Sequence, residues 1–217
     1  MPFFVFAPGE ALKNINTLTA LWNGMMKEGL NKNDLLVNIG GGVVTDLGGF
    51  AAATYKRGMN FINIPTTLIG QADAAIGGKT GINFSEVKNS IGTFHDPMAV
   101  FIMEDFLRTL PFRHLRNGMA EIIKCSFLEG PAAWERLQSM AGNWQENVLD
   151  LLPHSVRFKC QVVAMDPFDQ NRRRMLNFGH TIGHGIEDLQ CQPGRKTLLH
   201  GEAVAVGLIC ESFLATE

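Results

Sequence analysis

The sequence has no long apolar run, no long block of lysine and arginine and no closely spaced cysteine pair. No stretch approaches the roughly 18 to 20 apolar residues of a membrane-spanning helix, so we expect no membrane partner. The opening MPFFVFAPGE lacks the three regions of a signal peptide, which predicts a cytoplasmic protein. With a formal net charge of only -2 and dispersed lysines and arginines, nucleic acid is not an expected partner. A small molecule is the expected ligand.

Cysteine is scarce as well. The four residues, Cys125, Cys160, Cys191 and Cys210, form no CxxC pair, which argues against a zinc knuckle and a disulfide framework and predicts free thiols. Apolar residues, in contrast, make up 46% of the 217 positions, which is enough to bury a full core in one large or two small domains. We therefore expect a globular protein.

The first half of the chain alternates apolar runs with glycine-rich turns. Residues 35–39 (LLVNI) run into three consecutive glycines, and the following VVTDLGGFAAATYKRG has helical spacing. Residues 61–65 (FINIP) form a second short strand closed by proline, and FFVF near the start is a further candidate. Strands that alternate with helices predict a parallel sheet of the Rossmann-like α/β type.

From about Phe106 onwards the pattern changes to long helical periods. These occur in FLRTLP, in RHLRNGMAEIIKCSFLEG and near residues 147–165 and 174–190, so the second half is predicted to be mostly α-helical. We expect two domains, 1–105 and 106–217. Because a complete doubly wound sheet needs more strand and helix units, and the chain closes inside an apolar helix, it is predicted to be truncated at both ends.

Two glycine-rich segments are candidates for anion binding. In GGGVVTD the glycines let the backbone turn tightly, and a helix start offers free N–H groups to a phosphate, although a plain structural turn is an equally good interpretation. The run PTTLIGQADAAIGGKTGIN gathers hydroxyls, an acid, a lysine and an amide. Lys79, and Lys88 with Asn89 shortly after it, are suited to a phosphate or carboxylate, and a solvated surface loop is the alternative.

Three of the six histidines lie between residues 180 and 200. His180 and His184 are four apart and share one face of a helix, and His200 follows in HGEAV. Imidazoles with a carboxylate are the usual ligands of a catalytic Zn²⁺ or similar ion. The best carboxylate is Glu121, in an apolar helical stretch where burial without a partner would cost several kcal/mol. The pattern predicts a metal centre, although each histidine alone suits a structural role equally well.

Seven ordered segments resemble the motifs of the 3-dehydroquinate synthase family, within the sugar-phosphate cyclases. They are PGEALK, GGGVVTDLGGFAAATYKRG, IPTTLIGQADAAIGGKTGIN, KNSIGTF, TLPFRHLRNGMAEIIK, LNFGHTIGH and HGEAVAVG. The resemblance implies a phosphorus–oxygen lyase of the shikimate pathway that converts 3-deoxy-D-arabino-heptulosonate 7-phosphate into 3-dehydroquinate and phosphate. The implied course is transient oxidation by NAD, phosphate elimination, re-reduction and aldol ring closure, in a homodimer.

The resemblance also implies roles for individual residues. The metal ligands, to zinc or cobalt, fall on Glu121, His180 and His200, which leaves His184 as a substrate-contacting residue. The other implied catalytic or substrate-binding residues are Lys79, Asn89, Lys124, Lys159, Arg173 and Asn177. The implied NAD-binding positions are Glu10, Lys13, Gly41, Gly42, Asp46, Thr66, Thr67, Asp73, Lys88 and Thr109. Arg57 matches an arginine that reaches the substrate phosphate in a neighbouring subunit.

Three alternatives stay open. The first is another sugar-phosphate cyclase, acting on a substrate such as sedoheptulose 7-phosphate, or an amino-dehydroquinate synthase. The second is a metal-dependent alcohol or glycerol dehydrogenase, against which the lysines of KTGIN and KN favour an anionic substrate. The third is a binding module without activity.

The family has further segments before PGEALK and after HGEAVAVG, so we expect the present chain to bind metal and phosphate but to turn over poorly.

Overall fold

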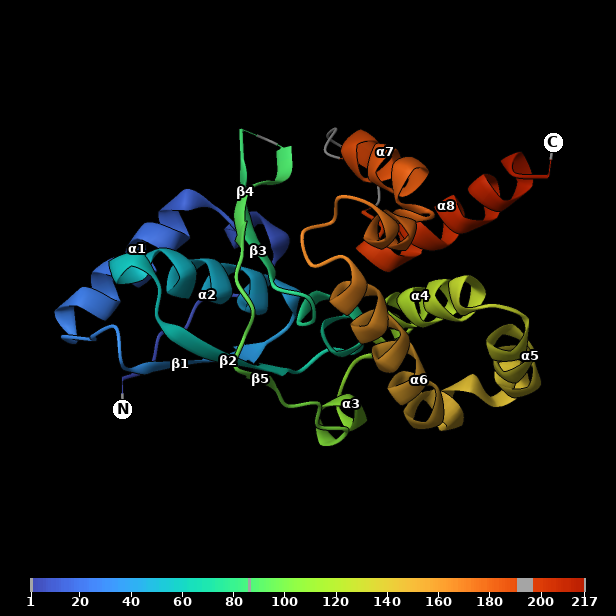
Figure 1. Ribbon diagram of the computed structural model, residues 1–217, viewed down its shortest axis with the longest axis horizontal. Helices are drawn as coiled ribbons and strands as arrows, with labels where there is room; N and C mark the ends of the chain where they lie inside the picture. Colours follow the sequence, from blue (N-terminus) through green and yellow to red (C-terminus); the bar gives the residue numbers. More distant parts are fainter. Residues whose placement is uncertain (1, 86, 191–196, 217) are drawn as a thin grey trace. The chain divides into compact units, whose positions relative to one another are not determined.

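The computed structural model describes residues 2–85, 87–190 and 197–216 (Figure 1). The chain forms two compact units, Met1–Thr66 with Ala74–Met103 and Thr67–Asp73 with Glu104–Glu217. The first unit is α/β and the second is helical, which confirms the predicted fold class. The segment Thr67–Asp73 groups with the helices of the second unit. No helix in the described ranges is long and apolar enough to cross a membrane.

A three-stranded sheet, in the order β1-β2-β5, forms the centre of the α/β unit. Its strands are β1 (Leu35–Gly40), β2 (Asn60–Pro65) and β5 (Ala99–Val100), and both pairings are parallel. The strands expected at 35–39 and 61–65 are therefore confirmed, as is their parallel arrangement.

The FFVF segment is not a strand, contrary to the prediction. Residues 2–7 have no regular secondary structure, yet Phe4 and Phe6 pack against the core while Phe3 and Val5 are exposed. Phe4 lies over Gly24, where an added Cβ would come within 2.5 Å of its ring. The alternation therefore reflects an extended segment packed on a helix rather than on the sheet.

The α/β unit contains two α-helices, α1 (Ile15–Lys27) and α2 (Gly42–Thr54). Asn14 caps α1 by accepting the Thr17 N–H at 3.0 Å. Helix α2 contacts β1 and β2, and a Cβ on Gly48 would stand only 2.0 Å from Oδ1 of Asn38, so the glycine permits this close approach. The short 3-10 helices η1 (Glu10–Leu12) and η2 (Tyr55–Arg57) complete the helical elements of this unit.

An antiparallel hairpin of β3 (Lys79–Phe84) and β4 (Val87–Phe94) was not predicted. The segment that was interpreted as a polar, loop-like site therefore forms a strand over its last five residues, 79–83. Gly81 pairs with Gly92, where a Cβ would lie 2.1 Å from the carbonyl oxygen of Thr80. The glycines thus permit the close contact between the two strands.

The second unit is helical, as predicted. Its elements are α3 (Asp105–Arg108), α4 (Phe112–Glu129), α5 (Pro131–Met140), η4 (Ala141–Asn143), α6 (Trp144–Met165), η5 (Arg172–Asn177), α7 (His180–Gln190) and α8 (His200–Leu214), and the π-helix η3 (Gly70–Ala74) lies at the division between the units. Leu68, Ile122 and Leu151 are fully or almost fully buried in its main core. The helix expected over residues 174–190 is interrupted, because Gly179 adopts a φ of +80° between η5 and α7.

Candidate metal centre

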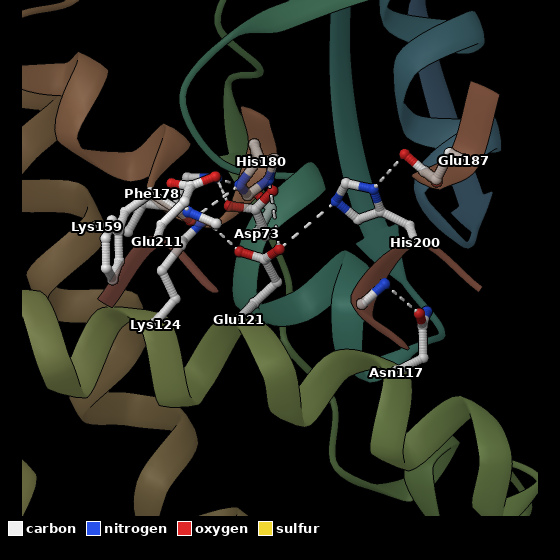
Figure 2. A network of polar contacts seen from close by, with 12 residues as sticks. Asp73, Asn117, Glu121, Lys124, Lys159, Phe178, His180, Glu187, His200 and Glu211 are labelled. Atoms are coloured by element: carbon white, nitrogen blue, oxygen red, sulfur yellow. Dashed lines mark hydrogen bonds and ion pairs between the residues drawn. The ribbon is translucent and has the colours of Figure 1, made fainter. Parts of the chain in front are cut away.

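Glu121, His180 and His200 converge in the helical unit from three different helices (Figure 2). Glu121 lies in the middle of α4, whereas His180 and His200 are the first residues of α7 and α8. Oε1 of Glu121 is 3.7 Å from Nε2 of His180 and 3.6 Å from Nε2 of His200. The three residues predicted as metal ligands are therefore brought together.

Glycines allow the three helices to approach closely enough for this convergence. Helix α8 packs against both α4 and α7. A Cβ on Gly201 would lie 1.9 Å from the carbonyl oxygen of Asn117 on α4, and a Cβ on Gly207 would lie 1.9 Å from that of Gly179, just before α7. Any larger residue at either position would separate α8 from its neighbour. The glycines of HGEAVAVG therefore set the spacing on which the centre depends.

The Glu121 carboxylate is fully buried and suited to a cation. Among the described residues, neither of its oxygens has a hydrogen bond of good geometry, although Lys124 one turn later forms an ion pair with it. Burial by itself raises the pKa of Glu121, but Lys124, His200 and His180 together hold that pKa well below its ordinary value. The group is therefore an ionised carboxylate with unused acceptor capacity.

Lys124 is almost fully buried beside the same carboxylate. Burial alone would lower the pKa of Lys124, yet the Glu121 and Asp73 carboxylates raise it above the ordinary value. The ammonium consequently keeps its charge.

The two histidines differ in electrostatic environment. Burial, with Lys124 as the next cause, lowers the pKa of His180, so its ring is neutral near pH 7. Burial also opposes protonation of His200, but the neighbouring carboxylates of Glu121 and Glu187 raise the pKa of His200 to about 10. In the absence of an ion, a proton on His200 therefore balances part of the local negative charge.

These residues fit a divalent cation. The nitrogen–oxygen separations exceed normal hydrogen-bond lengths. They are close to the roughly 3.4 Å that separates two ligand atoms at about 2.1 Å from an ion with tetrahedral angles. Two imidazoles and one carboxylate are also a donor set of catalytic zinc sites.

His184 is exposed and its ring centroid lies 5.4 Å from that of His180 and 6.0 Å from that of His200. The two histidines of α7 do share one side of the helix, as predicted. His184, Glu187 and His200 form a second group whose ligand atoms lie within 4.8 Å of one another. Glu187 was missed in the sequence, although its spacing of seven residues from His180 places it on the same helical face.

Two other predicted residues of the helical unit pair with each other. Nζ of Lys159 donates to the backbone oxygen of Asp73 at 2.6 Å and to its Oδ1 at 2.5 Å. Burial works against ionisation of Asp73, but the charge of Lys159 gives the carboxyl a lowered pKa. The pair is therefore a lysine ammonium held against a carboxylate.

Arg173, a predicted substrate-binding residue, is buried. Its Nη1 donates to the carbonyl oxygen of Pro167 at 2.8 Å, and its backbone N–H donates to Asp166. Asp166 also accepts the N–H groups of Gln170 and Asn171, so it organises the turn that precedes η5. Sequence reasoning missed this aspartate.

In the α/β unit, three predicted residues form one polar cluster. Nζ of the buried Lys13 lies 2.5 Å from Oδ2 of Asp46 and 2.5 Å from Oδ1 of Asn89. Glu10, a fourth predicted residue, accepts a hydrogen bond from Asn83 at 2.9 Å. Asn83 was not singled out, although it ends the GKTGIN segment.

The predicted glycine turn lies as expected between β1 and α2. Gly41 is the N-cap of α2, and no side chain of the described residues caps this helix start. Gly42 has Ala74 at 3.1 Å from the position of a Cβ, so a side chain there would crowd the turn. The first N–H groups of α2 are thus available to an anion.

The remaining predicted residues are spread over both units. Arg57, Thr66, Lys79 and Lys88 lie in the α/β unit, whereas Thr67, Thr109 and Asn177 lie in the helical unit. Thr67 accepts the Gly70 N–H at the start of η3. Arg57, Lys79, Thr109 and Asn177 are exposed. The described cysteines, Cys125, Cys160 and Cys210, are free thiols as expected, and Cys191 lies outside the described residues.

Two solved structures with high similarity to this fold are sugar-phosphate cyclases. The 2-epi-5-epi-valiolone synthase of Streptomyces hygroscopicus subsp. jinggangensis, with NAD⁺ and Zn²⁺ bound, has a TM-score of 0.83 and 34% identity, over 94% of this chain and 57% of that one. A 2-deoxy-scyllo-inosose synthase complexed with carbaglucose-6-phosphate, NAD⁺ and Co²⁺ has a TM-score of 0.80 and 28% identity, over 97% and 59% of the two chains.

Sequence comparison agrees along nearly the whole chain. The 3-dehydroquinate synthase from Parabacteroides distasonis is 45% identical over 217 residues, which cover 99% of this chain and 61% of that protein. The chain thus spans about 60% of the length of the curated relatives it matches. The N-terminal family of 3-dehydroquinate synthase matches residues 3–117, and the C-terminal family matches residues 118–217. The chain therefore belongs to the 3-dehydroquinate synthase family.

Proposed function

We propose that this chain carries the metal centre and part of the NAD site of a 3-dehydroquinate synthase. The reaction would convert 3-deoxy-D-arabino-heptulosonate 7-phosphate into 3-dehydroquinate and phosphate. The observation that supports the proposal best is the convergence of Glu121, His180 and His200 on one point, with an unsatisfied buried carboxylate at its centre. When bound, NAD supplies the oxidation and later re-reduction of the substrate, and the ion polarises the substrate oxygens involved.

The residues around the centre suit a substrate with several oxygens and negative charge. Lys124 keeps its ammonium charge at a buried position, so it can bind a substrate oxygen close to the metal ligands. Lys159 is held in place by Asp73, which accepts two of its three N–H donors and fixes the direction of the third. His184 is exposed on the same face of α7 as His180, where it can exchange a proton with a bound substrate. We assign these three residues to substrate binding and proton transfer.

In the α/β unit we assign the glycine turn to the pyrophosphate of NAD. The open N-terminus of α2 after β1 offers backbone N–H groups and the positive end of the helix dipole to that group. Lys13 contacts both Asp46 of this helix and Asn89 of β4, so a change in one of the three affects the positions of the others. The assignments of Glu10, Thr66, Thr67, Lys88 and Thr109 to NAD, of Lys79, Arg173 and Asn177 to substrate, and of Arg57 to a homodimer remain predictions.

Zinc binding by the 217-residue chain tests the proposed ligands. Alanine at His180 or Glu121 should abolish tight Zn²⁺ binding, measured by competition with a chromophoric chelator, because each change removes one of three protein ligands. Alanine at His184 should leave the ion bound. His114→Ala is the matched control, since His114 is exposed and lies outside both ligand groups. Equal zinc loss from His180→Ala and His184→Ala would contradict the division of roles.

Activity is tested separately, by phosphate release from the heptulosonate phosphate with NAD and Zn²⁺ or Co²⁺ present. We expect slow turnover, because the chain spans about 60% of the length of its relatives. Turnover should fall further in His184→Ala while zinc stays bound. A normal turnover rate would contradict the expectation of poor activity.

A second candidate is another sugar-phosphate cyclase. The 34% identity to a 2-epi-5-epi-valiolone synthase supports it, against 45% identity to a 3-dehydroquinate synthase. Incubation with the heptulosonate phosphate and with sedoheptulose 7-phosphate in parallel, followed by mass detection of the cyclic products, separates the two. Cyclisation of sedoheptulose 7-phosphate alone would favour the second candidate over 3-dehydroquinate synthase.

A further inference from the structure

Each helix that provides a proposed metal ligand also provides a second polar side chain, directed at the start of another of these helices (Figure 2). Asn117 of α4 and the Glu121 ligand are one helical turn apart, and Glu187 of α7 follows the His180 ligand by two turns. Glu211 lies near the end of α8, which begins with the His200 ligand. The three polar residues are evenly distributed among the ligand helices.

Glu187 contacts the imidazole of His200 directly. Its Oε2 lies 3.4 Å from Nδ1 of His200, while Nε2 of the same ring faces Glu121. The Glu187 side chain is buried, so water does not weaken this contact strongly. A carboxylate at Nδ1 keeps a proton on that nitrogen and leaves Nε2 available for an ion, and it also fixes the plane of the ring.

Glu211 acts on the backbone at the start of α7. Its Oε2 accepts the N–H of Gly179 at 2.7 Å, and its Oε1 accepts the N–H of Ile182 at 3.1 Å. Both oxygens therefore satisfy donors that a helix start leaves without partners, and a negative charge there is favoured by the helix dipole. His180 lies between these two amides, so its Cα position is fixed by a side chain of α8.

Asn117 acts in the same way at the start of α8. Its buried side-chain oxygen accepts the Gly201 N–H at 2.6 Å, directly after His200. Asn117 and Glu121 are on the same face of α4, four residues apart. The position of one ligand helix is thereby tied to the helix that carries the carboxylate ligand.

We propose that Asn117, Glu187 and Glu211 are positioning residues that preset the ligands before an ion binds. The inference rests on the proposed metal-dependent function. Asn117 of α4 and Glu187 of α7 both contact the start of α8, and Glu211 of α8 contacts the start of α7. The first residues of α7 and α8, which include the two histidine ligands, are therefore held by side chains of other helices. Removal of such partners typically reduces metal affinity 10- to 100-fold.

Substitutions of glutamate by glutamine test the proposal, because they remove the charge and keep the size of the side chain. In the full chain, Glu187→Gln and Glu211→Gln should each weaken Zn²⁺ binding by roughly 10- to 100-fold, measured with a competing chelator, while one ion still binds. The matched control is Asp188→Asn, which removes an exposed carboxylate next to Glu187 on the same helix. The visible spectrum of bound Co²⁺ should change in the first two variants and not in the control, because it reports coordination geometry.

A measurement on the unmodified protein makes the test independent of how the variants fold. In the zinc-loaded chain, a long-range ¹H–¹⁵N spectrum of the imidazoles should show His200 protonated at Nδ1 and coordinated through Nε2. The opposite arrangement would overturn the role of Glu187.

Three other outcomes decide the proposal. Unchanged zinc affinity in both glutamine variants would refute positioning while leaving the metal centre intact. Two bound ions in the wild type, reduced to one in Glu187→Gln, would make Glu187 a direct ligand with His184 and would also refute it. No zinc binding by the folded wild type would instead overturn the proposed function, and this inference with it.

Discussion

Alanine at Gly207 should damage both the stability of the helical unit and its metal affinity. The new Cβ would stand 1.9 Å from the carbonyl oxygen of Gly179, whereas an ordinary contact between such atoms is above 3 Å. Relief requires a displacement of more than about 1 Å between α8 and the start of α7, where His180 lies. Overpacking of this kind typically costs about 1–3 kcal/mol.

A matched glycine in α7 provides the control. Gly185 has no atom within 4 Å of the position of a Cβ and does not have a positive φ, so Gly185→Ala is sterically free. Replacement of a helical glycine by alanine in open space gains roughly 0.5–1 kcal/mol. The two substitutions add the same methyl group and should have opposite effects on stability.

Urea unfolding and zinc competition on the same samples test the reasoning. We expect Gly207→Ala to lower the free energy of unfolding by about 1–3 kcal/mol and to weaken zinc binding, because His180 moves with Gly179. Gly185→Ala should raise stability slightly and leave the zinc affinity unchanged. Equal free energies of unfolding in the two variants would refute the claim that Gly207 is needed for the close packing of α8 on the start of α7. A less stable Gly207→Ala variant with full zinc affinity would show that this packing does not determine the position of His180.

Two further predictions concern pH. A hydrogen bond from Arg113 is the main reason why the pKa of Glu202 is lowered to about 2, so this pair stabilises the fold above the unfolded pKa near 4.5. That contribution should disappear as pH falls from about 4.5 to 2, and acid unfolding of Arg113→Ala should lack this part of the pH dependence. Because His200 is protonated at pH 8 without an ion, whereas Glu121 is ionised and His180 neutral, zinc binding at pH 8 should release about one proton. Calorimetry in buffers of different ionisation enthalpy measures that number, and a value near zero would contradict the raised pKa of His200.

The parts of the fold that sequence predicted correctly depend on local patterns. The strand at residues 35–39, the glycine turn and α2 follow one another within twenty residues, and each has its own composition. The helix spacing of His180 and His184 is also local. Glu121 was recognised as the carboxylate ligand because it lies in an otherwise apolar stretch of a predicted helix, where burial without a partner is costly.

The hairpin was missed, and the first segment was wrongly predicted as a strand, because polar–apolar alternation alone does not determine whether a segment forms a strand. In β3 the residues from Thr80 to Ile82 are buried consecutively, so the polar–apolar alternation that marks a strand is absent. In residues 3–6 the alternation is present, but Phe4 and Phe6 pack on the core and no strand of the described sheet pairs with this segment. Polar–apolar alternation indicates that one face of an extended segment is buried. A strand also needs a neighbouring strand with which its backbone can form hydrogen bonds.

Glu187 and Glu211 were also missed, because their roles depend on contacts between helices rather than on a local sequence pattern. In the sequence both are ordinary acids in amphipathic or apolar helices, and each acquires its role only from the start of the neighbouring helix. Their contacts are possible because the glycines at positions 201 and 207 bring α8 within backbone contact of α4 and α7. The ligands can therefore be read from residue type and spacing, but the residues that hold them depend on how the helices pack. A search for such positioning groups should begin at the glycines that determine helix spacing, since these mark where a carboxylate of one helix can reach the free amides of the next.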